Sequence, residues 1–123
     1  MKRLLVVDDE DNIREIAQLC LELAGWEVLT ASSGAEGLAC AENERPDAVL
    51  LDVMMPGLDG PSTFQRLQDN PLTQSIPVIL LTAKVQGADR RRFADLGVHA
   101  VLAKPFDPLS LADTIAAALG WSS

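Results

Sequence analysis

Five short apolar runs alternate with longer amphipathic segments, and this alternation limits the fold more than any other feature of the sequence. Leu4–Val7, Ala48–Leu51 and Val78–Leu81 are unbroken aliphatic runs, as expected for strands buried on both faces of a sheet. Val28–Ala31 and Ala100–Ala103 are weaker versions and fit the outer strands. Because a helix-like segment follows each run, we predict an α/β protein of five βα units, a doubly wound five-stranded parallel sheet with helices on both faces.

The segments between the runs carry signals for helix ends. Ser33 opens a capping box, which predicts a helix through about Ala41. Gly60–Pro61 places proline at a first helical position. A further helix is predicted over Ala88–Leu96, and Asp107–Pro108 predicts the N-cap and first turn of the last helix.

Polar and charged residues stand directly after four of the apolar runs. Asp8 and Asp9 follow the first run, Asp52 follows the third, Thr82 the fourth and Lys104 the fifth. Function in open parallel sheets gathers beyond the carboxyl ends of the strands. We therefore expect these five side chains to meet in one site.

The charges of this group favour a divalent metal ion. Two carboxylates about 4 Å apart repel each other by roughly 4 kcal/mol at an effective dielectric of about 20. Lys104 supplies one positive charge, which does not balance three acids. Ligation by oxygen alone suits Mg²⁺, and the group lacks the cysteines and histidines that bind zinc.

A metal, a lysine, a hydroxyl and a carboxylate are the usual groups for handling a phosphoryl group. The sequence has no glycine-rich phosphate loop of the kind that binds ATP or GTP. The phosphoryl group is therefore expected to arrive on a partner.

Length and composition limit the number of domains, the possible partners and the cellular compartment. The 123 residues fit one domain. The formal net charge of −8 repels nucleic acid, so direct DNA or RNA binding is not expected. The apolar runs are far shorter than the roughly 18 residues that span a membrane. Two cysteines make no secreted disulfide framework, and we expect a cytoplasmic protein.

Four segments form a set of motifs that occur in order and in register. They are Leu5–Glu10 (LVVDDE), Leu50–Gly60 (LLDVMMPGLDG), Pro77–Ala83 (PVILLTA) and Ala103–Phe106 (AKPF). Together they resemble the receiver domain of bacterial two-component response regulators, the fold of the chemotaxis regulator. The resemblance implies the flavodoxin-like strand order 2-1-3-4-5 and one receiver domain over residues 1–123, with no effector domain in this chain.

The resemblance also implies a role for each acid. Asp52 would be the phosphoacceptor, which attacks a phosphohistidine to give an acyl phosphate. Asp9, Asp52 and the backbone carbonyl of Met54 would bind Mg²⁺, with Mn²⁺ as an alternative. Asp8 would act mainly through a metal-bound water.

Three further residues are implied to act on the phosphoryl group. Lys104 would pair with a phosphoryl oxygen, helped by the backbone N–H of Ala83. The hydroxyl of Thr82 would turn inward to hydrogen-bond the same group. The protein would be a phosphoacceptor that assists its own phosphorylation and dephosphorylation, and not an enzyme in the ordinary sense.

The implied partners are proteins. A sensor histidine kinase or histidine phosphotransfer protein would donate the phosphoryl group. The phosphorylated form would control a downstream partner or effector domain through the face of helix 4, strand 5 and helix 5. The chain is expected to be a monomer or weak homodimer, either a stand-alone receiver or a domain of a longer regulator.

Three other readings use some of the same features. A haloacid-dehalogenase-type phosphatase also uses a strand-end aspartate and Mg²⁺, but it needs a second acid where this chain has Met54. A flavodoxin-shaped cofactor module needs Ser/Thr/Gly-rich phosphate loops after the first strand, where this chain has acids. A receiver-like binding domain that is never phosphorylated would not need the full set of acids, Thr82 and Lys104.

Two expectations concern the last strand. The family often has Tyr or Phe three positions before the lysine, where this chain has Val101. Since valine is short and stiff at χ1, we expect signalling through helix 4 and the loop after Thr82, with little change in the strand. The resemblance also implies a cis Lys104–Pro105 peptide bond, because the lysine must turn back over the strand end to reach the phosphoryl group.

Overall fold

The computed structural model describes residues 1–83 and 87–121. Part of the loop after Thr82, to which signalling was assigned above, therefore lies outside the described residues at 84–86. No helix in the described part has the length and apolar character to cross a membrane. The elements are β1 (Arg3–Val7), α1 (Asp11–Leu23), β2 (Glu27–Ala31), α2 (Gly34–Glu44), β3 (Ala48–Asp52), α3 (Gly60–Asp69), β4 (Val78–Thr82), α4 (Gly87–Ala94), β5 (Ala100–Ala103) and α5 (Leu111–Leu119).

The strands form a parallel sheet in the order β2-β1-β3-β4-β5. Leu5 of β1 pairs with Leu29 of β2 on one side and with Val49 of β3 on the other. This order confirms the predicted topology, with β2 and β5 as the outer strands. The carboxyl ends of β1, β3 and β4 therefore lie next to one another at the middle of one edge.

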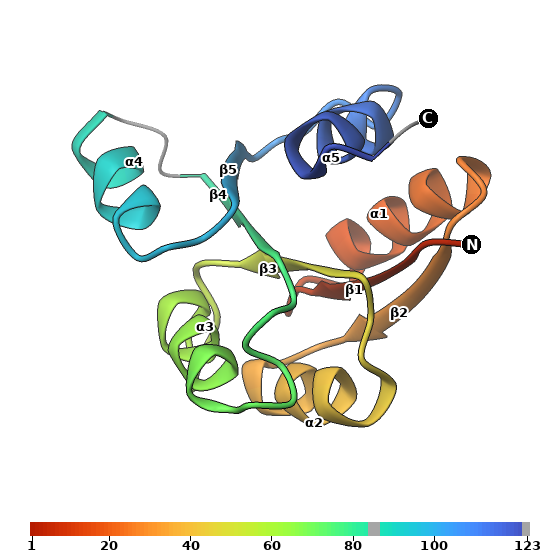
Figure 1. Ribbon diagram of the computed structural model, residues 1–123. Helices are drawn as coiled ribbons and strands as arrows, with labels where there is room; N and C mark the ends of the chain where they lie inside the picture. Colours follow the sequence, from red (N-terminus) through yellow and green to blue (C-terminus); the bar gives the residue numbers. More distant parts are fainter. Residues whose placement is uncertain (84–86, 122–123) are drawn as a thin grey trace.

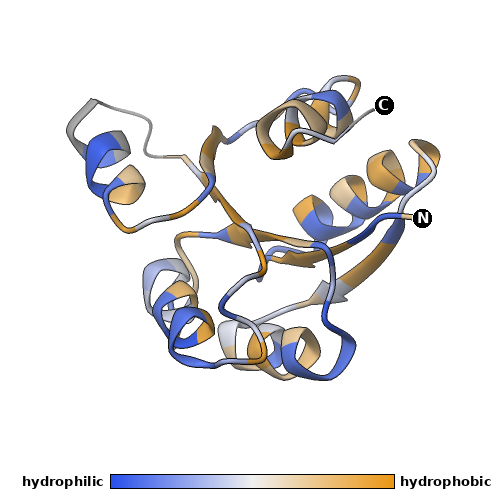
Figure 2. Cartoon of the chain, viewed as in Figure 1, coloured by the Kyte–Doolittle hydropathy of each residue, from blue (hydrophilic) through white to orange (hydrophobic). Residues whose placement is uncertain are grey.

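The helices cover the sheet in two layers, with α1 and α5 on one face and α2, α3 and α4 on the other (Figure 1). Leu50 of β3 packs in one core cluster with Leu21 of α1 and Ile115 of α5. The next residue, Leu51, points to the opposite face and shares a cluster with Phe93 of α4. Figure 2 shows the strands as the most hydrophobic part of the chain, with hydrophilic residues concentrated on helices and loops.

The second helix has the predicted start but a later end. Ser33 caps α2 as expected, because its hydroxyl oxygen accepts the Glu36 N–H at 3.1 Å. The helix continues past the expected end at Ala41 as far as Glu44. Arg45 then adopts a left-handed backbone, with φ of 46°, and its N–H donates to the Ala41 carbonyl.

The last helix begins later than predicted. Its N-cap is Ser110, not Asp107, and the helix starts at Leu111. Asp107 instead forms a turn, in which its side chain accepts the Leu109 N–H at 3.0 Å and its carbonyl accepts the Ser110 N–H at 3.1 Å. The prediction of a helix start at Asp107–Pro108 was wrong because an Asx turn and an N-cap use the same side-chain acceptor.

Two tryptophans tie the end of α5 to the amino-terminal edge of the sheet. Trp26 directly precedes β2, and Trp121 lies just beyond α5. Their rings meet edge to face, with centroids 5.2 Å apart and an interplanar angle of 82°. The Lys2 ammonium lies 4.9 Å from the Trp121 ring centroid. This contact is at the edge of the sheet opposite the carboxyl ends of the strands.

Gly60 marks the closest approach of α3 to the end of β3. Its N–H donates to the Val53 carbonyl at 2.9 Å. A Cβ at this position would lie 2.5 Å from the Asp52 carbonyl oxygen and 2.7 Å from the Val53 Cα. Both are backbone atoms of the segment that carries Asp52, so neither can turn aside. Gly60 thus allows the loop to fold tightly over the strand end.

We predict that Gly60→Ala lowers the free energy of unfolding by on the order of 3 kcal/mol, because the added methyl forces the backbone apart. Urea unfolding measures the loss. Gly57→Ala is the matched control: Gly57 has φ of +76° and open space around its Cβ position, so only left-handed backbone strain is added. That strain costs about 1 kcal/mol. Equal losses in the two variants would contradict the close-approach argument.

Candidate functional site

The residues expected to meet lie together at the carboxyl edge of the sheet. Asp52 and Thr82 are the last residues of β3 and β4. Asp8 and Asp9 directly follow β1, and Lys104 directly follows β5. Four strands therefore deliver one functional group or more to the same place.

The three aspartates form a compact acidic cluster. One carboxylate oxygen from each of Asp8, Asp9 and Asp52 lies within 4.8 Å of the others. Asp8 is fully buried and Asp52 is only 2% exposed. Burial strengthens the mutual repulsion of these carboxylates, because solvent screens them poorly.

Lys104 provides the positive charge at the centre of the cluster. Its Nζ lies 2.9 Å from Asp8 Oδ2 and 3.1 Å from Asp52 Oδ1. The lysine side chain is only 12% exposed, so these ion pairs are shielded from water. A third carboxylate, that of Glu10, reaches the same ammonium from the surface at 3.4 Å.

Protonation of the cluster follows from burial and charge. Burial, reinforced by the negative charge of Asp8, raises the pKa of Asp52 to about 6, although Lys104 acts in the opposite direction. Burial alone would lower the pKa of the Lys104 ammonium, but its hydrogen bonds and ion pairs with Asp8 and Asp52 raise that pKa overall. The lysine is therefore cationic at neutral pH.

The donor set fits a hard divalent cation. Asp9 Oδ1 and Asp52 Oδ2 are buried and have no hydrogen-bond partner among the described residues. Buried carboxylate oxygens without a partner are costly, so a cation that they ligate would be stabilising. Oxygen ligands from few side chains match the preference of Mg²⁺, which retains several waters.

The remaining predicted residues lie in or just beyond β3, β4 and β5. Thr82 is fully buried at the end of β4, and Ala83 follows it at the surface. The Met54 side chain is 58% exposed, two residues beyond the end of β3. Val101 lies half-buried in β5. The Lys104–Pro105 peptide bond is cis, as predicted.

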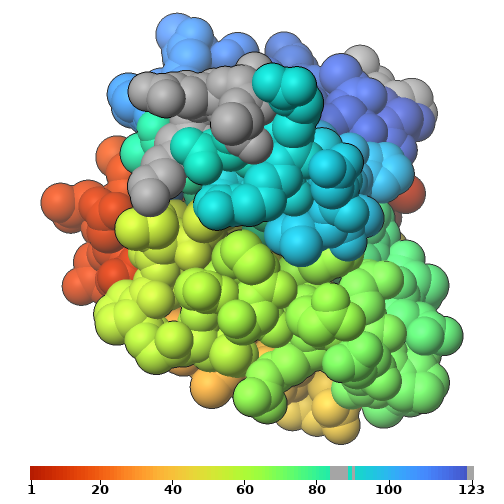
Figure 3. Space-filling model, turned by 90° about the vertical axis from the view of Figure 1, so that its left-hand side faces the viewer, coloured from red at the N-terminus to blue at the C-terminus, as the bar shows by residue number. Residues whose placement is uncertain are grey.

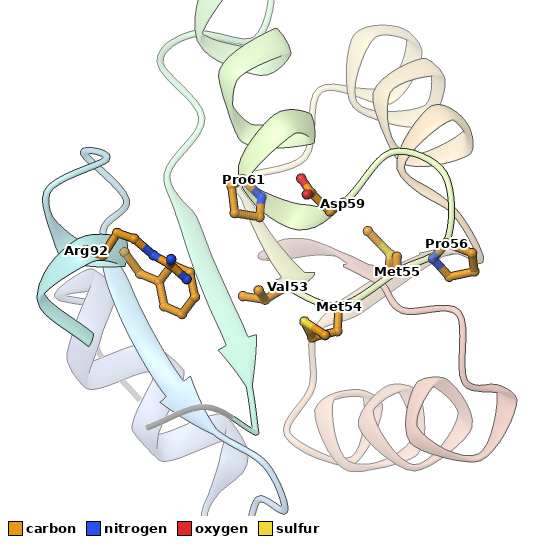
Figure 4. A pocket seen from close by; sticks show the side chains of 8 residues that line it. Val53, Met54, Met55, Pro56, Asp59, Pro61 and Arg92 are labelled. Atoms are coloured by element: carbon orange, nitrogen blue, oxygen red, sulfur yellow. The ribbon is translucent and has the colours of Figure 1, made fainter. Parts of the chain in front are cut away.

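A groove of about 460 Å³ lies between the loop after β3, the start of α3 and helix α4. Figure 3 shows the face on which α3 and α4 adjoin. In Figure 4, Val53 and Met54 lie on one side of the groove and Arg92 on the other, with Asp59 and Pro61 at the start of α3. The segment directly after Asp52 thus lines the same groove as α4.

Two residues of the site were not assigned by sequence reasoning. Glu10 pairs with Lys104, a contact across the sheet edge that no local pattern announces. Arg14 contacts the loop that carries Asp8 and Asp9. Its i, i+3 spacing from Asp11 on a helix was the available signal, because such pairs meet on a helix surface.

Known proteins resemble this chain in sequence and in fold. The family model described as Response regulator receiver domain matches residues 4–116. The alkaline phosphatase synthesis transcriptional regulatory protein PhoP of Bacillus subtilis is 43% identical over 107 residues, which are 87% of this chain and 44% of that protein. The phosphate regulon transcriptional regulatory protein PhoB of Pseudomonas aeruginosa is 38% identical over 118 residues, 96% of this chain and 52% of that protein. The chain spans about half the length of these relatives.

Solved structures agree over nearly the full length. The chemotaxis response regulator CheY4 of Vibrio cholerae has a TM-score of 0.90 and 31% identity, with 96% of this chain and 98% of that chain covered. A response regulator receiver domain protein from Clostridium thermocellum has a TM-score of 0.86 and 31% identity, with coverages of 98% and 95%. These similarities include both helical layers and the sheet edge that carries the acids.

We predict that Asp52→Asn stabilises the metal-free protein at pH 7.5 and that the gain shrinks at pH 5. The pKa of Asp52 is about 6 in the folded state, above the ordinary value of about 3.9 in the unfolded chain. The folded state therefore binds the proton more tightly. The stability that this proton on Asp52 contributes is fully present below about pH 4 and is lost as the pH rises through about 6. Asparagine at position 52 carries no charge, so the variant does not lose this stability as the pH rises.

Urea unfolding in EDTA at the two pH values measures the difference, expected to be about 1–3 kcal/mol at pH 7.5. Asp69→Asn, at an exposed position at the end of α3, is the control and should change stability by less than about 0.5 kcal/mol. A pH-independent effect of Asp52→Asn would show that its charge is not the source of the instability.

Proposed function

This chain belongs to the response regulator receiver domain family of two-component systems, and from this premise we propose that it accepts a phosphoryl group on Asp52. Receiver domains are signalling domains and not conventional enzymes, and phosphorylation on aspartate is general in the family. Family membership also decides against the phosphatase and the cofactor module. The observation that carries the proposal is the buried Asp52 carboxylate, with one oxygen on Lys104 and the other without a partner in the described residues.

The proposed donor is a phosphohistidine of a sensor histidine kinase or a histidine phosphotransfer protein. An Asp52 carboxylate oxygen attacks the phosphorus, and the P–N bond to the donor histidine breaks. The imidazole nitrogen leaves with the bonding electrons and is protonated, which leaves an acyl phosphate on Asp52. The buried setting of the carboxylate keeps it in one orientation for this attack.

Asp9, Asp52 and the Met54 carbonyl are proposed to hold Mg²⁺ or Mn²⁺, with Asp8 acting through a metal-bound water. When bound, the ion would offset negative charge on the transferring phosphoryl group. Its proposed ligands lie in the cluster whose unpartnered oxygens are described above, apart from Met54, which adjoins Asp52 in the chain.

Lys104, Thr82 and Ala83 are proposed to bind the phosphoryl oxygens. The Lys104 ammonium lies within 3.1 Å of both buried acids, so it is placed to exchange a carboxylate contact for one with phosphate. The Thr82 hydroxyl and the Ala83 N–H come from the adjacent end of β4. Fixed donors of this kind stabilise developing charge without rearranging during the reaction.

The output is proposed to pass through the face formed by α4, β5 and α5, with α4 carrying most of the change and β5 little of it. We place this receiver in the cytoplasm as one domain over residues 1–123, monomeric or weakly dimeric. Its signal would reach a separate protein partner, or an effector domain in the same polypeptide as in a longer regulator. The curated relatives described above are transcriptional regulators about twice as long as this chain.

We predict that acetyl phosphate with Mg²⁺ adds one phosphoryl group, and that beryllofluoride with Mg²⁺ likewise gives one adduct. Intact-protein mass spectrometry detects the phosphoryl group, and peptide mapping should place it on Asp52. Asp69→Asn should behave as the wild type, because it lies on the surface at the end of α3. Phosphoryl uptake by Asp52→Asn at the wild-type rate would overturn the assignment.

We predict that Asp9→Asn separates metal affinity from stability. It should weaken Mg²⁺ binding by about tenfold or more, since a ligand is lost. It should leave the metal-free protein as stable as the wild type or more so, because one repelling charge is removed. Calorimetric titration and urea unfolding in EDTA measure the two quantities.

Glu10→Gln is the control for this pair of measurements. It removes the same charge from the neighbouring residue, which is 62% exposed and outside the proposed ligand set. Its Mg²⁺ affinity should stay within about twofold of the wild type, because water screens the exposed charge. Wild-type affinity in Asp9→Asn would show that Asp9 is not a ligand.

A further inference from the structure

The Arg14 side chain contacts both ends of the loop that joins β1 to α1. Its Nη1 donates to the Asp8 backbone carbonyl at 2.8 Å, and its Nη2 pairs with Asp11 Oδ1 at 2.5 Å. Asp8 is the first residue after the strand, and Asp11 is the first residue of the helix. One guanidinium therefore holds both ends of a loop whose middle carries Asp9 and Glu10.

This loop needs such a restraint because of the charges that it carries. It brings Asp8 and Asp9 close to Asp52, with each acid offering an oxygen within 4.8 Å of the others. Their repulsion acts to push the loop away from β3. Lys104 contacts Asp8 and Asp52, but no ion pair with Asp9 occurs among the described residues. The position of Asp9 therefore depends on the loop backbone.

The other contacts of the loop hold its strand end or its middle, where Glu10 also reaches Lys104 at 3.4 Å. The Asp8 N–H donates to the Ala31 carbonyl at 3.1 Å, which fixes the strand end. The Glu10 N–H donates to Asp8 Oδ1 at 2.9 Å, a bond within the loop itself. Among the side-chain contacts of the described residues, that of Arg14 alone bridges the strand end of this loop to its helix end. Its side chain is 19% exposed and that of Asp11 is 78% exposed, so the contact with the Asp8 carbonyl is the shielded one of the two.

We propose that Arg14 is a positioning residue for the metal site: it preorganises the β1–α1 loop so that Asp9 faces Asp52 before the cation arrives. This inference rests on the proposed function, because it takes Asp9 and Asp52 as Mg²⁺ ligands. Arg14 acts through the loop backbone and does not itself bind the metal or the phosphoryl group. A fork of two donors suits this task, since it spans two acceptors in a fixed geometry.

The sign of one measurement separates positioning from simple electrostatics. Arg14 is a cation close to a cation site, so as a charge alone it repels Mg²⁺. Removing that charge would then tighten Mg²⁺ binding. If Arg14 positions Asp9, the same substitution weakens Mg²⁺ binding, because the loop must be ordered at the expense of binding free energy.

The test is calorimetric titration of the folded chain with Mg²⁺ alone. Arg14→Met keeps an unbranched side chain and removes the fork, and we expect its affinity to fall by about tenfold. Arg14→Lys keeps the charge but not the fork, and its affinity should lie between those of Arg14→Met and the wild type. If Arg14→Met does not fold, Arg14→Lys serves as the test in its place. We then expect Arg14→Lys to bind Mg²⁺ more weakly than the wild type, and wild-type affinity would overturn the proposal.

Arg92→Met is the matched control. Arg92 also pairs with an aspartate three residues earlier on a helix, Asp89, at 3.5 Å, and no contact among the described residues joins it to the β1–α1 loop. Its side chain is 66% exposed, so water screens its charge. Its affinity for Mg²⁺ should be unchanged. Unchanged or tighter binding by Arg14→Met overturns the positioning role. Failure of the wild type to bind Mg²⁺, in contrast, would refute the proposed metal site itself.

Discussion

A single ammonium group, that of Lys104, holds together two buried carboxylates that would otherwise repel each other. Asp8 comes from the end of β1 and Asp52 from the end of β3, while the lysine follows β5. The contact therefore fixes the relative positions of three strand ends. It does not neutralise the site, because one positive charge faces two carboxylates and Asp9 adds a third. An apolar cluster of similar volume would often be more stable, so the charge imbalance is better explained by chemistry than by stability.

The surrounding core offsets this cost. Residues of β1, β3 and β4 are buried on both faces, and each fully buried aliphatic side chain contributes about 1.5–3 kcal/mol. Leu50 and Leu51 in adjacent positions pack into opposite layers, so β3 is held from both sides up to Asp52. A site mounted on such strands is more precise than one mounted on loops alone. The β1–α1 loop is the exception, and there a guanidinium replaces the core as the restraint.

The sequence predicted most of the sheet and the membership of the acidic cluster, because buried strands and their terminal residues leave a direct pattern. The ends of the helices were harder to predict from the sequence. Asp107 carries the signal of an N-cap but forms a turn, and α2 is capped by Arg45 without the glycine that usually marks a left-handed cap. The contact of Glu10 with Lys104 joins residues from opposite ends of the chain. Its geometry depends on side-chain rotamers, which no local pattern encodes.

The tryptophan pair has an optical consequence. The chain contains two tryptophans and no tyrosine, so its near-ultraviolet absorption and intrinsic emission come almost entirely from one edge-to-face pair of indole rings. These rings lie at the amino-terminal edge of the sheet, whereas the acids and Lys104 lie at the carboxyl edge. Their fluorescence emission therefore reports whether the end of α5 is packed against the sheet. It reads the docking of that helix separately from the chemistry at the opposite edge.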